Sequence, residues 1–185
     1  IETVGSGIPR IDFSDDANGA LLLEPQRTNS LVQSNQFDTS WINSVTTVTS
    51  GYLGLDGTNT AWLLSKTANS SANIRQNISF SGIHTFSVYL KKGTNTSAIL
   101  RSTGGTDASL QIDLSNGSII GETNTMSILV ESMGNNWYRC SMTFNASSNT
   151  AVRIYPESPL GGSTAGSIYI QYAQLEQGSY ATSYI

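Results

Sequence analysis

The sequence predicts an all-β protein, and three observations carry that prediction. Short runs of alternating apolar and polar residues recur along the chain, clusters of Gly, Asn, Asp and Ser separate them, and no run keeps a helical period. Many short strands at this spacing are typical of a sandwich or a barrel. With 185 residues, the chain has room for one such domain with a hydrophobic core.

Each alternating run predicts one strand. The expected strands are Ala20–Glu24, Val45–Thr49, Ala61–Lys66, Asn73–Phe80, Thr85–Lys91, Ser97–Ser102, Ser109–Leu114, Met126–Ser132, Trp137–Asn145, Ala151–Pro156 and Ser167–Leu175. Asn116 and Gly117 lie between two such runs and both tolerate positive φ, which predicts a two-residue hairpin.

The strand expected at Thr85–Lys91 favours a sandwich. Phe86, Val88 and Leu90 alternate with Ser87, Tyr89 and Lys91, so one face is apolar and the other carries an aromatic ring, a hydroxyl and an ammonium. Such an outer face suits a sugar better than a second layer of core. The pattern therefore indicates a β-sandwich with a polar, aromatic outer sheet, and binding rather than catalysis.

Composition and charge exclude several partners. Only 12% of the residues are charged and the net charge is −4, whereas nucleic-acid binding needs a concentrated basic stripe. No apolar run approaches the ~20 residues that span a bilayer, so we expect no membrane insertion. The chain shows no signal-peptide pattern and starts with Ile, which predicts a fragment or a processed product.

Catalytic machinery is hard to assemble from these residues. Cys140 is the single cysteine and His84 the single histidine, which excludes an internal disulfide and leaves a Ser–His–Asp triad or a zinc site without enough members. Most of the acids lie in turn-like contexts, where hydrogen bonding within the turn explains them. We therefore expect the protein not to be an enzyme. Asp12, Asp15 and Asp16 lack the spacing of a helix–loop–helix calcium site, and a solvated loop explains them better.

Sugar recognition needs aromatic faces for the C–H side of the ring and planar donors for its hydroxyls. On the outward faces of the expected strands, the residues that supply both kinds are Tyr89, Lys91, Gln111, Trp137, Arg139, Arg153 and Tyr155. The alternatives are that such residues stand singly on exposed sheet faces and that Trp137 caps an edge of the core.

One border divides the chain into two segments. Residues 1–28 are less regular than the rest and are expected to form a strap or linker that packs on the sandwich. Residues 29–185 are expected to form the sandwich itself.

Several segments, in their order, resemble the jelly-roll carbohydrate-binding modules appended to bacterial xylanases and glucanases. They are Asn29–Asp38, Trp41, Asp56–Thr58, Gln76, Thr85–Lys91, Trp137 and Ile168–Glu176. The resemblance implies a two-sheet antiparallel jelly roll of the galactose-binding-like type, with a structural calcium ion in many members. Asp38 matches the first calcium-binding acid of the family. Gln171 and Tyr172 stand where an acidic pair is expected, so the sequence departs from the family there.

A closer likeness is to domains of phage tail-fibre and other virion-appendage proteins. Leu23–Asn29 and Gln174–Ile185 look like the borders of those domains. The likeness implies a jelly roll on a fibre that is often trimeric and that faces host surface glycans. Only Tyr89 carries across as a ligand residue.

The function expected from the sequence is non-catalytic recognition of a bacterial surface polysaccharide by a phage appendage, on the virion. One alternative is a structural spacer or trimer-forming domain of a virion fibre without its own ligand. A second is the targeting module of a secreted polysaccharide-degrading enzyme, and a third is a lyase or hydrolase in its own right.

Overall fold

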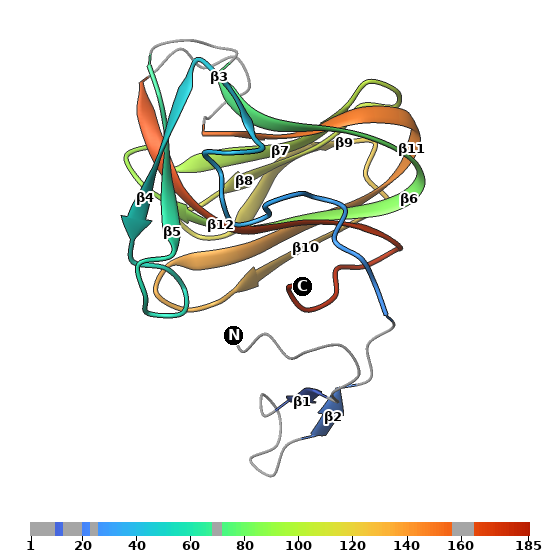
Figure 1. The fold of residues 1–185 in the computed structure, drawn as a ribbon, viewed down its shortest axis with the longest axis horizontal. Helices are drawn as coiled ribbons and strands as arrows, with labels where there is room; N and C mark the ends of the chain where they lie inside the picture. The colour runs from blue at the N-terminus through green and yellow to red at the C-terminus, as the bar shows by residue number, and fades with distance from the viewer. Residues whose placement is uncertain (1–9, 13–19, 23–25, 68–71, 157–164) are drawn as a thin grey trace.

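The computed structural model describes residues 10–12, 20–22, 26–67, 72–156 and 165–185, and within these ranges the regular structure is all strand (Figure 1). Every strand pair is antiparallel. The predicted class, a two-sheet antiparallel β-sandwich with jelly-roll topology, is confirmed. No helix among the described residues has the length and hydropathy that a membrane span requires.

Two sheets form the sandwich and share two long strands. Sheet I contains β4 (Thr46–Tyr52), β5 (Ala61–Lys66), β12 (Gly166–Gln177), the second half of β6 (Asn73–Lys92), the first half of β11 (Trp137–Tyr155) and β10 (Ser127–Ser132). Sheet II contains β3 (Ile42–Ser44), the other halves of β6 and β11, β7 (Ser97–Thr103), β8 (Ala108–Asp113) and β9 (Ser118–Thr123). A separate pair joins β1 (Arg10–Asp12) and β2 (Ala20–Leu22).

Strands β6 and β11 each replace two strands of the sequence-based prediction. Their pairing runs from Trp137↔Lys91 in sheet I to Ile154↔Ile74 in sheet II, with register shifts at Ala146, Asn149 and Ala151. Gly82 takes a φ of 83° on the β6 side of this bend. The expected breaks between Asn73–Phe80 and Thr85–Lys91, and between Trp137–Asn145 and Ala151–Pro156, are therefore wrong, because bulges bend a ladder without ending it.

Other differences are local. The hairpin predicted at Asn116 and Gly117 exists between β8 and β9, but its loop has four residues, closed by a hydrogen bond from Gly117 N to Asp113 O at 2.8 Å.

The sequence did not predict β9, because its consecutive Ile119 and Ile120 break the alternation. Both side chains are half exposed at the sheet edge. Residues 1–9, 13–19 and 23–25 of the predicted strap, including Asp15 and Asp16, lie outside the described residues.

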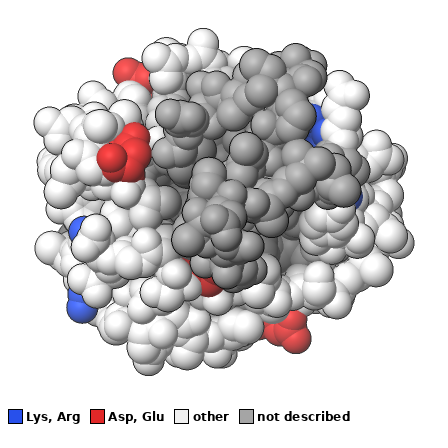
Figure 2. Space-filling view, turned by 90° about the horizontal axis from the view of Figure 1, so that it is seen from below, with Lys and Arg blue, Asp and Glu red and all other residues white. Residues whose placement is uncertain are grey.

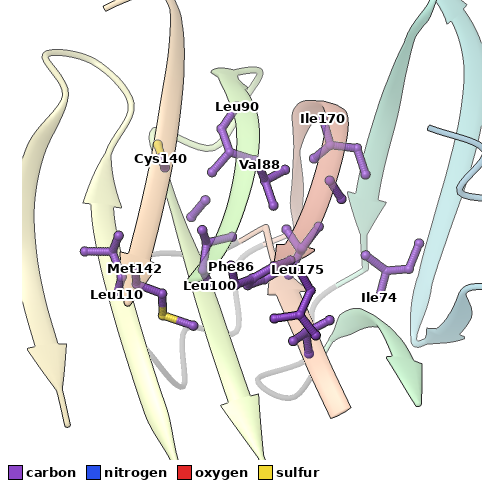
Figure 3. Close-up of a cluster of buried hydrophobic side chains, with 14 of the residues drawn as sticks. Ile74, Phe86, Val88, Leu90, Leu100, Leu110, Cys140, Met142, Ile170 and Leu175 are labelled. Atoms are coloured by element: carbon purple, nitrogen blue, oxygen red, sulfur yellow. The ribbon is translucent and has the colours of Figure 1, made fainter. Parts of the chain in front are cut away.

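The main core lies between the sheets (Figure 3). Phe86, Val88 and Leu90 are fully buried, as the alternation predicted, and face residues such as Leu100 and Leu110 of sheet II. Cys140 belongs to the same core, and burial raises the pKa of its thiol. It is therefore a structural residue and not a nucleophile.

The segment before β3 closes one end of the sandwich. Phe37 packs against Trp41 and Trp62 with ring centroids 5.1 and 6.2 Å apart. The buried amide of Gln76 accepts from Val32 N and donates to Val32 O, both at 2.7 Å. These bonds satisfy both backbone groups of Val32, which itself lies outside the strands.

The last residues, 178–185, fold back over the outer face of sheet I, beneath β12 in Figure 1. Thr85 and Thr143 donate their hydroxyls to the carbonyls of Gly178 and Ser179. Glu176 is fully buried and accepts from Thr182 N at 3.0 Å and from the Thr182 hydroxyl. This C-terminal segment therefore covers the half of the face built from short polar side chains.

Replacing Thr182 with Val should destabilise the fold by about 1–3 kcal/mol, because the buried Glu176 carboxyl loses one hydrogen-bond donor. Urea unfolding measures the change. Thr39→Val, at an exposed hydroxyl, is the matched control and should shift stability by less than ~0.5 kcal/mol. Equal effects of the two substitutions would contradict a structural role for the C-terminal segment.

Candidate functional site

The structure divides the predicted sugar-binding residues between two opposite faces. Tyr89 pairs with Arg139, and Lys91 pairs with Trp137, on the outer face of sheet I. The other three, Gln111, Arg153 and Tyr155, lie on the outer face of sheet II, because β11 has crossed into that sheet before it reaches them. Sequence alternation identified outward positions correctly but did not show which sheet each one belongs to.

A second apolar cluster lies on the outer face of sheet I. Tyr89, Trp137 and Ala61 form its floor, with Tyr89 and Trp137 only 4% and 1% exposed. Partly exposed side chains pack on this floor, namely Tyr52, Leu55, Tyr169 and Tyr172. We call these seven residues the aromatic face. The rings that a ligand would reach are therefore those of Tyr52, Tyr169 and Tyr172.

The rings contact one another edge to face or at a tilt. Tyr52 and Tyr169 lie 5.4 Å apart between centroids, and Tyr89 meets Tyr172 edge-on at 5.8 Å. Tyr184 of the C-terminal segment stacks at a tilt on Tyr172 at 4.5 Å. Contacts of this kind between aromatic rings favour particular ring orientations. They therefore restrict the rings of the aromatic face, although Tyr52, Tyr169 and Tyr172 stay partly exposed.

A β-bulge in β12 places two consecutive side chains on this face. The register shifts between Gln171 and Gln174, and Tyr172 takes a φ of 51°, an unusual value for a residue with a side chain. Gln171 donates to Thr60 at 2.7 Å and accepts from Leu55 N at 2.9 Å, while Tyr172 reaches the same loop. The bulge thus connects the aromatic face to the loop between β4 and β5.

That loop is shaped by close contacts. Gly54 lies against the Gln171 amide, and a Cβ there would come within 2.7 Å of Gln171 Nε2. Asp56 accepts from Thr58 N at 3.0 Å, from the Thr60 hydroxyl at 2.9 Å and from the Tyr172 hydroxyl at 3.0 Å. The loop therefore presents its carboxylate beside the exposed edge of Tyr172.

These contacts shift two pKa values in opposite directions. Slight burial raises the pKa of Asp56, but hydrogen bonds from Thr58, Thr60 and Tyr172 outweigh it, so the net pKa lies below 3.8. Burial, and then the hydrogen bond to Asp56 and its charge, raise the pKa of Tyr172 above 10.0. Between these values Asp56 is ionised and Tyr172 keeps its proton.

Two cations flank the floor. The Arg139 guanidinium carbon lies 5.6 Å from the Tyr89 ring centre, and Lys91 Nζ lies 5.9 Å from that of Trp137. One Arg139 nitrogen, Nη2, donates to the carbonyl of Thr182, while its buried Nε has no hydrogen-bond partner. The aromatic face therefore has a cationic donor on one side and the Asp56 carboxylate by the loop on another.

Other predicted or candidate groups lie elsewhere. Asp38 is exposed, and no group of three His, Cys, Asp or Glu residues within the described ranges is placed to hold a metal ion. His84 is buried and packs on Phe80 with ring centroids 5.0 Å apart. The calcium site suggested for Asp38 stays a prediction.

Comparison with solved structures found similar folds at low identity. The CBM22-1–GH10 modules of endo-1,4-β-D-xylanase 10B from Clostridium thermocellum, complexed with xylohexaose, match with TM-score 0.50 and 14% identity over 84% of this chain. The likeness establishes the fold. TmCBM61 in complex with β-1,4-galactotriose matches at TM-score 0.48 and 12% identity over 82% of the chain, and an exo-β-agarase at 0.48 and 9% over 80%.

The chain spans 28% of the xylanase chain, 99% of TmCBM61 and 25% of the agarase. No protein-family model matches the sequence, and no curated protein matches it.

Sequence reasoning missed the exposed rings and the carboxylate of the site, which belong to Tyr52, Tyr169, Tyr172 and Asp56. Tyr169 had a usable signal, since it alternates with the buried Ile168 and Ile170. Tyr172 had none, because the bulge that turns it outward breaks the alternation on which such a prediction depends.

The bond between Tyr172 and Asp56 should give a plateau in stability with pH. The pKa of Asp56 is lowered in the folded protein, so this group stabilises the fold above pH 3.8, and that stabilisation is lost as the pH falls below 3.8. The pKa of Tyr172 is raised, so this group stabilises the fold below pH 10.0, and that stabilisation is lost as the pH rises above 10.0. Tyr172→Phe should therefore cost about 0.5–1.5 kcal/mol on the plateau and less toward either end.

Urea unfolding of both proteins across this pH range measures the difference. Tyr180→Phe, at an exposed ring, is the control and should change stability by less than ~0.5 kcal/mol throughout. A Tyr172→Phe effect that grows outside the plateau would show that the hydroxyl and the carboxylate do not act as a pair.

Proposed function

We propose that the aromatic face binds a glycan without cleaving it. The observation that carries this proposal is the gathering of Tyr52, Tyr169 and Tyr172, all partly exposed, over a buried aromatic floor outside the core. Core packing does not need these rings, since the interior between the sheets is filled by a separate cluster. Rings at the surface of a sheet fit the flat, apolar C–H faces of sugars.

The polar groups around the rings support the same ligand. Arg139, Lys91 and Asp56 offer charged donors and an acceptor to sugar hydroxyls. In the part of the face that Figure 2 shows outside its grey atoms, Lys, Arg, Asp and Glu are scattered and form no patch. A neutral glycan is the ligand class that we assign to the aromatic face, because the side chains of the face itself are aromatic and apolar rather than ionic.

The comparison at TM-score 0.50 is in keeping with this proposal, because that protein was solved with xylohexaose. Its low identity carries no ligand residue across. The residues of the aromatic face are thus assigned from their own geometry.

Tyr52→Ala and Tyr169→Ala should each weaken glycan binding about tenfold, because each removes one stacking ring, worth roughly 1–1.5 kcal/mol. A glycan array identifies the ligand, and titration calorimetry then measures the variants. Tyr180→Ala, at a half-exposed ring held by Arg27 outside the aromatic face, should bind within about twofold of the parent protein.

Unchanged binding by both ring variants, with melting temperatures preserved, would assign the ligand to another surface. If the parent protein binds no glycan, the structural spacer becomes the better interpretation.

We further propose that the chain serves a phage appendage that contacts the bacterial surface. The support is the resemblance at its two ends, Leu23–Asn29 and Gln174–Ile185. Single glycan sites are commonly weak, and three copies on a fibre would raise avidity through effective concentration.

A pull-down on intact bacteria and on their purified surface polysaccharides tests this context. Binding to them in preference to xylan and galactan is expected. The reverse preference would favour the targeting module of a secreted polysaccharide-degrading enzyme.

A further inference from the structure

Three arginines stand side by side on the outer face of sheet II. Arg153 of β11 pairs with Arg75 of β6 on one side and with Arg101 of β7 on the other. Their strand neighbours, such as Ile154 and Leu100, point into the core, so the three guanidinium groups share the opposite face. We call these three residues the arginine row.

The arginine row has few acidic partners among the described residues. Arg101 Nη2 forms an ion pair with Asp107 at 2.7 Å, and the other oxygen of Asp107 accepts from Gly104 N at 3.2 Å. Arg153 Nε donates to the neutral hydroxyl of Thr103 at 3.1 Å. In the part of the chain that the structure describes, this one carboxylate forms the only ion pair of the row, although all three side chains are partly exposed.

Such an arrangement costs stability on its own. Like charges directly opposite each other on neighbouring strands repel, and the effect is felt twice along this row. The chain has nine Lys and Arg residues and a net charge of −4, so three cations at one register are a local concentration in an acidic protein. All three are arginines, whose planar forks match carboxylate and phosphate oxygens in pairs.

On the same face of sheet II, two neutral side chains lie two residues further along the strands from the arginine row. Tyr155 and Gln111 flank Ile99 in the next register, and Gln111 Nε2 is buried without a hydrogen-bond partner. The β9 residue opposite Gln111 is Gly121, which adds no side chain above the amide. The row therefore lies beside an amide donor that no described group satisfies.

We propose that the arginine row binds the acidic groups of a polysaccharide, on the side of the sandwich opposite the aromatic face. Carboxylate or phosphate groups pair with Arg75 and Arg153, whose side chains are partly exposed. The polysaccharide part of this assignment rests on the proposed function, whereas the acidic part rests on the arginines alone. An acidic repeat carrying its charges at intervals matches a row that spans three strands.

Titration with polygalacturonate, its fully methyl-esterified form and inorganic polyphosphate tests the proposal at low and high salt. The parent protein should bind polygalacturonate at low salt, lose most of that binding in 0.5 M NaCl and ignore the neutral ester. Arg75→Gln and Arg153→Gln should each weaken binding about tenfold. Arg153→Lys keeps the charge but not the fork, and should fall between Arg153→Gln and the parent.

Lys92→Gln is the matched control, because it removes one positive charge at an exposed site away from the row. It should change binding by less than about twofold, and circular dichroism should show that no variant melts below the parent protein, since removing a like charge from the row relieves repulsion. Equal losses in Lys92→Gln and the arginine variants, or no loss in the latter, would overturn the proposal. Binding of polyphosphate but not polygalacturonate would overturn the assignment to a polysaccharide.

These experiments test the aromatic face and the arginine row independently of each other. Tyr52→Ala and Tyr169→Ala should leave polygalacturonate binding unchanged, and the arginine variants should leave neutral glycan binding unchanged. A parent protein that binds polygalacturonate but no neutral glycan would refute the aromatic face and leave the arginine row standing. A parent protein that binds a neutral glycan but no polygalacturonate would refute the arginine row and leave the aromatic face standing.

Discussion

The ladder between β6 and β11 is the constraint on which the rest of the structure depends. These two strands, 20 and 19 residues long, are the longest in the described part of the chain and belong to both sheets. Because the pairing continues through the bend, one alternation of side chains lines a single core and leaves outward residues on two opposite surfaces. The positions of the aromatic face and of the arginine row both follow from this geometry.

The bend contains glycine and asparagine, which are residue types common in turns. Gly82 on β6 and the register shifts near Ala146 and Asn149 on β11 absorb the curvature while the strands remain paired. The Asn149 side chain donates to the Ser102 hydroxyl and to Thr106 O at 2.8 Å, which ties the bulge to β7 and the loop that follows it. The Asn149 Nδ2 donor is thus satisfied locally, whereas its buried Oδ1 has no hydrogen-bond partner.

The outer face of sheet I shows how one face can be divided between stability and binding. Short polar residues such as Thr85 and Thr143 hold the C-terminal segment, which covers them. Aromatic residues next to that segment stay partly exposed, and Tyr184 reaches across to stack on Tyr172. Arg139 belongs to both halves, since it donates to Thr182 and lies over the Tyr89 ring.

The sequence by itself determined the class of fold, most strands and which residues point inward, because side chains alternate along a strand whatever its partners are. It identified Phe86, Val88 and Leu90 as core, and Tyr89, Lys91 and Arg139 as outward residues, and these assignments are confirmed. Only the tertiary structure decided that Arg153 and Tyr155 lie on the other face and that Tyr172 turns outward. Strand crossing and bulges depend on pairing between residues far apart in the chain, and a local pattern carries no record of that pairing.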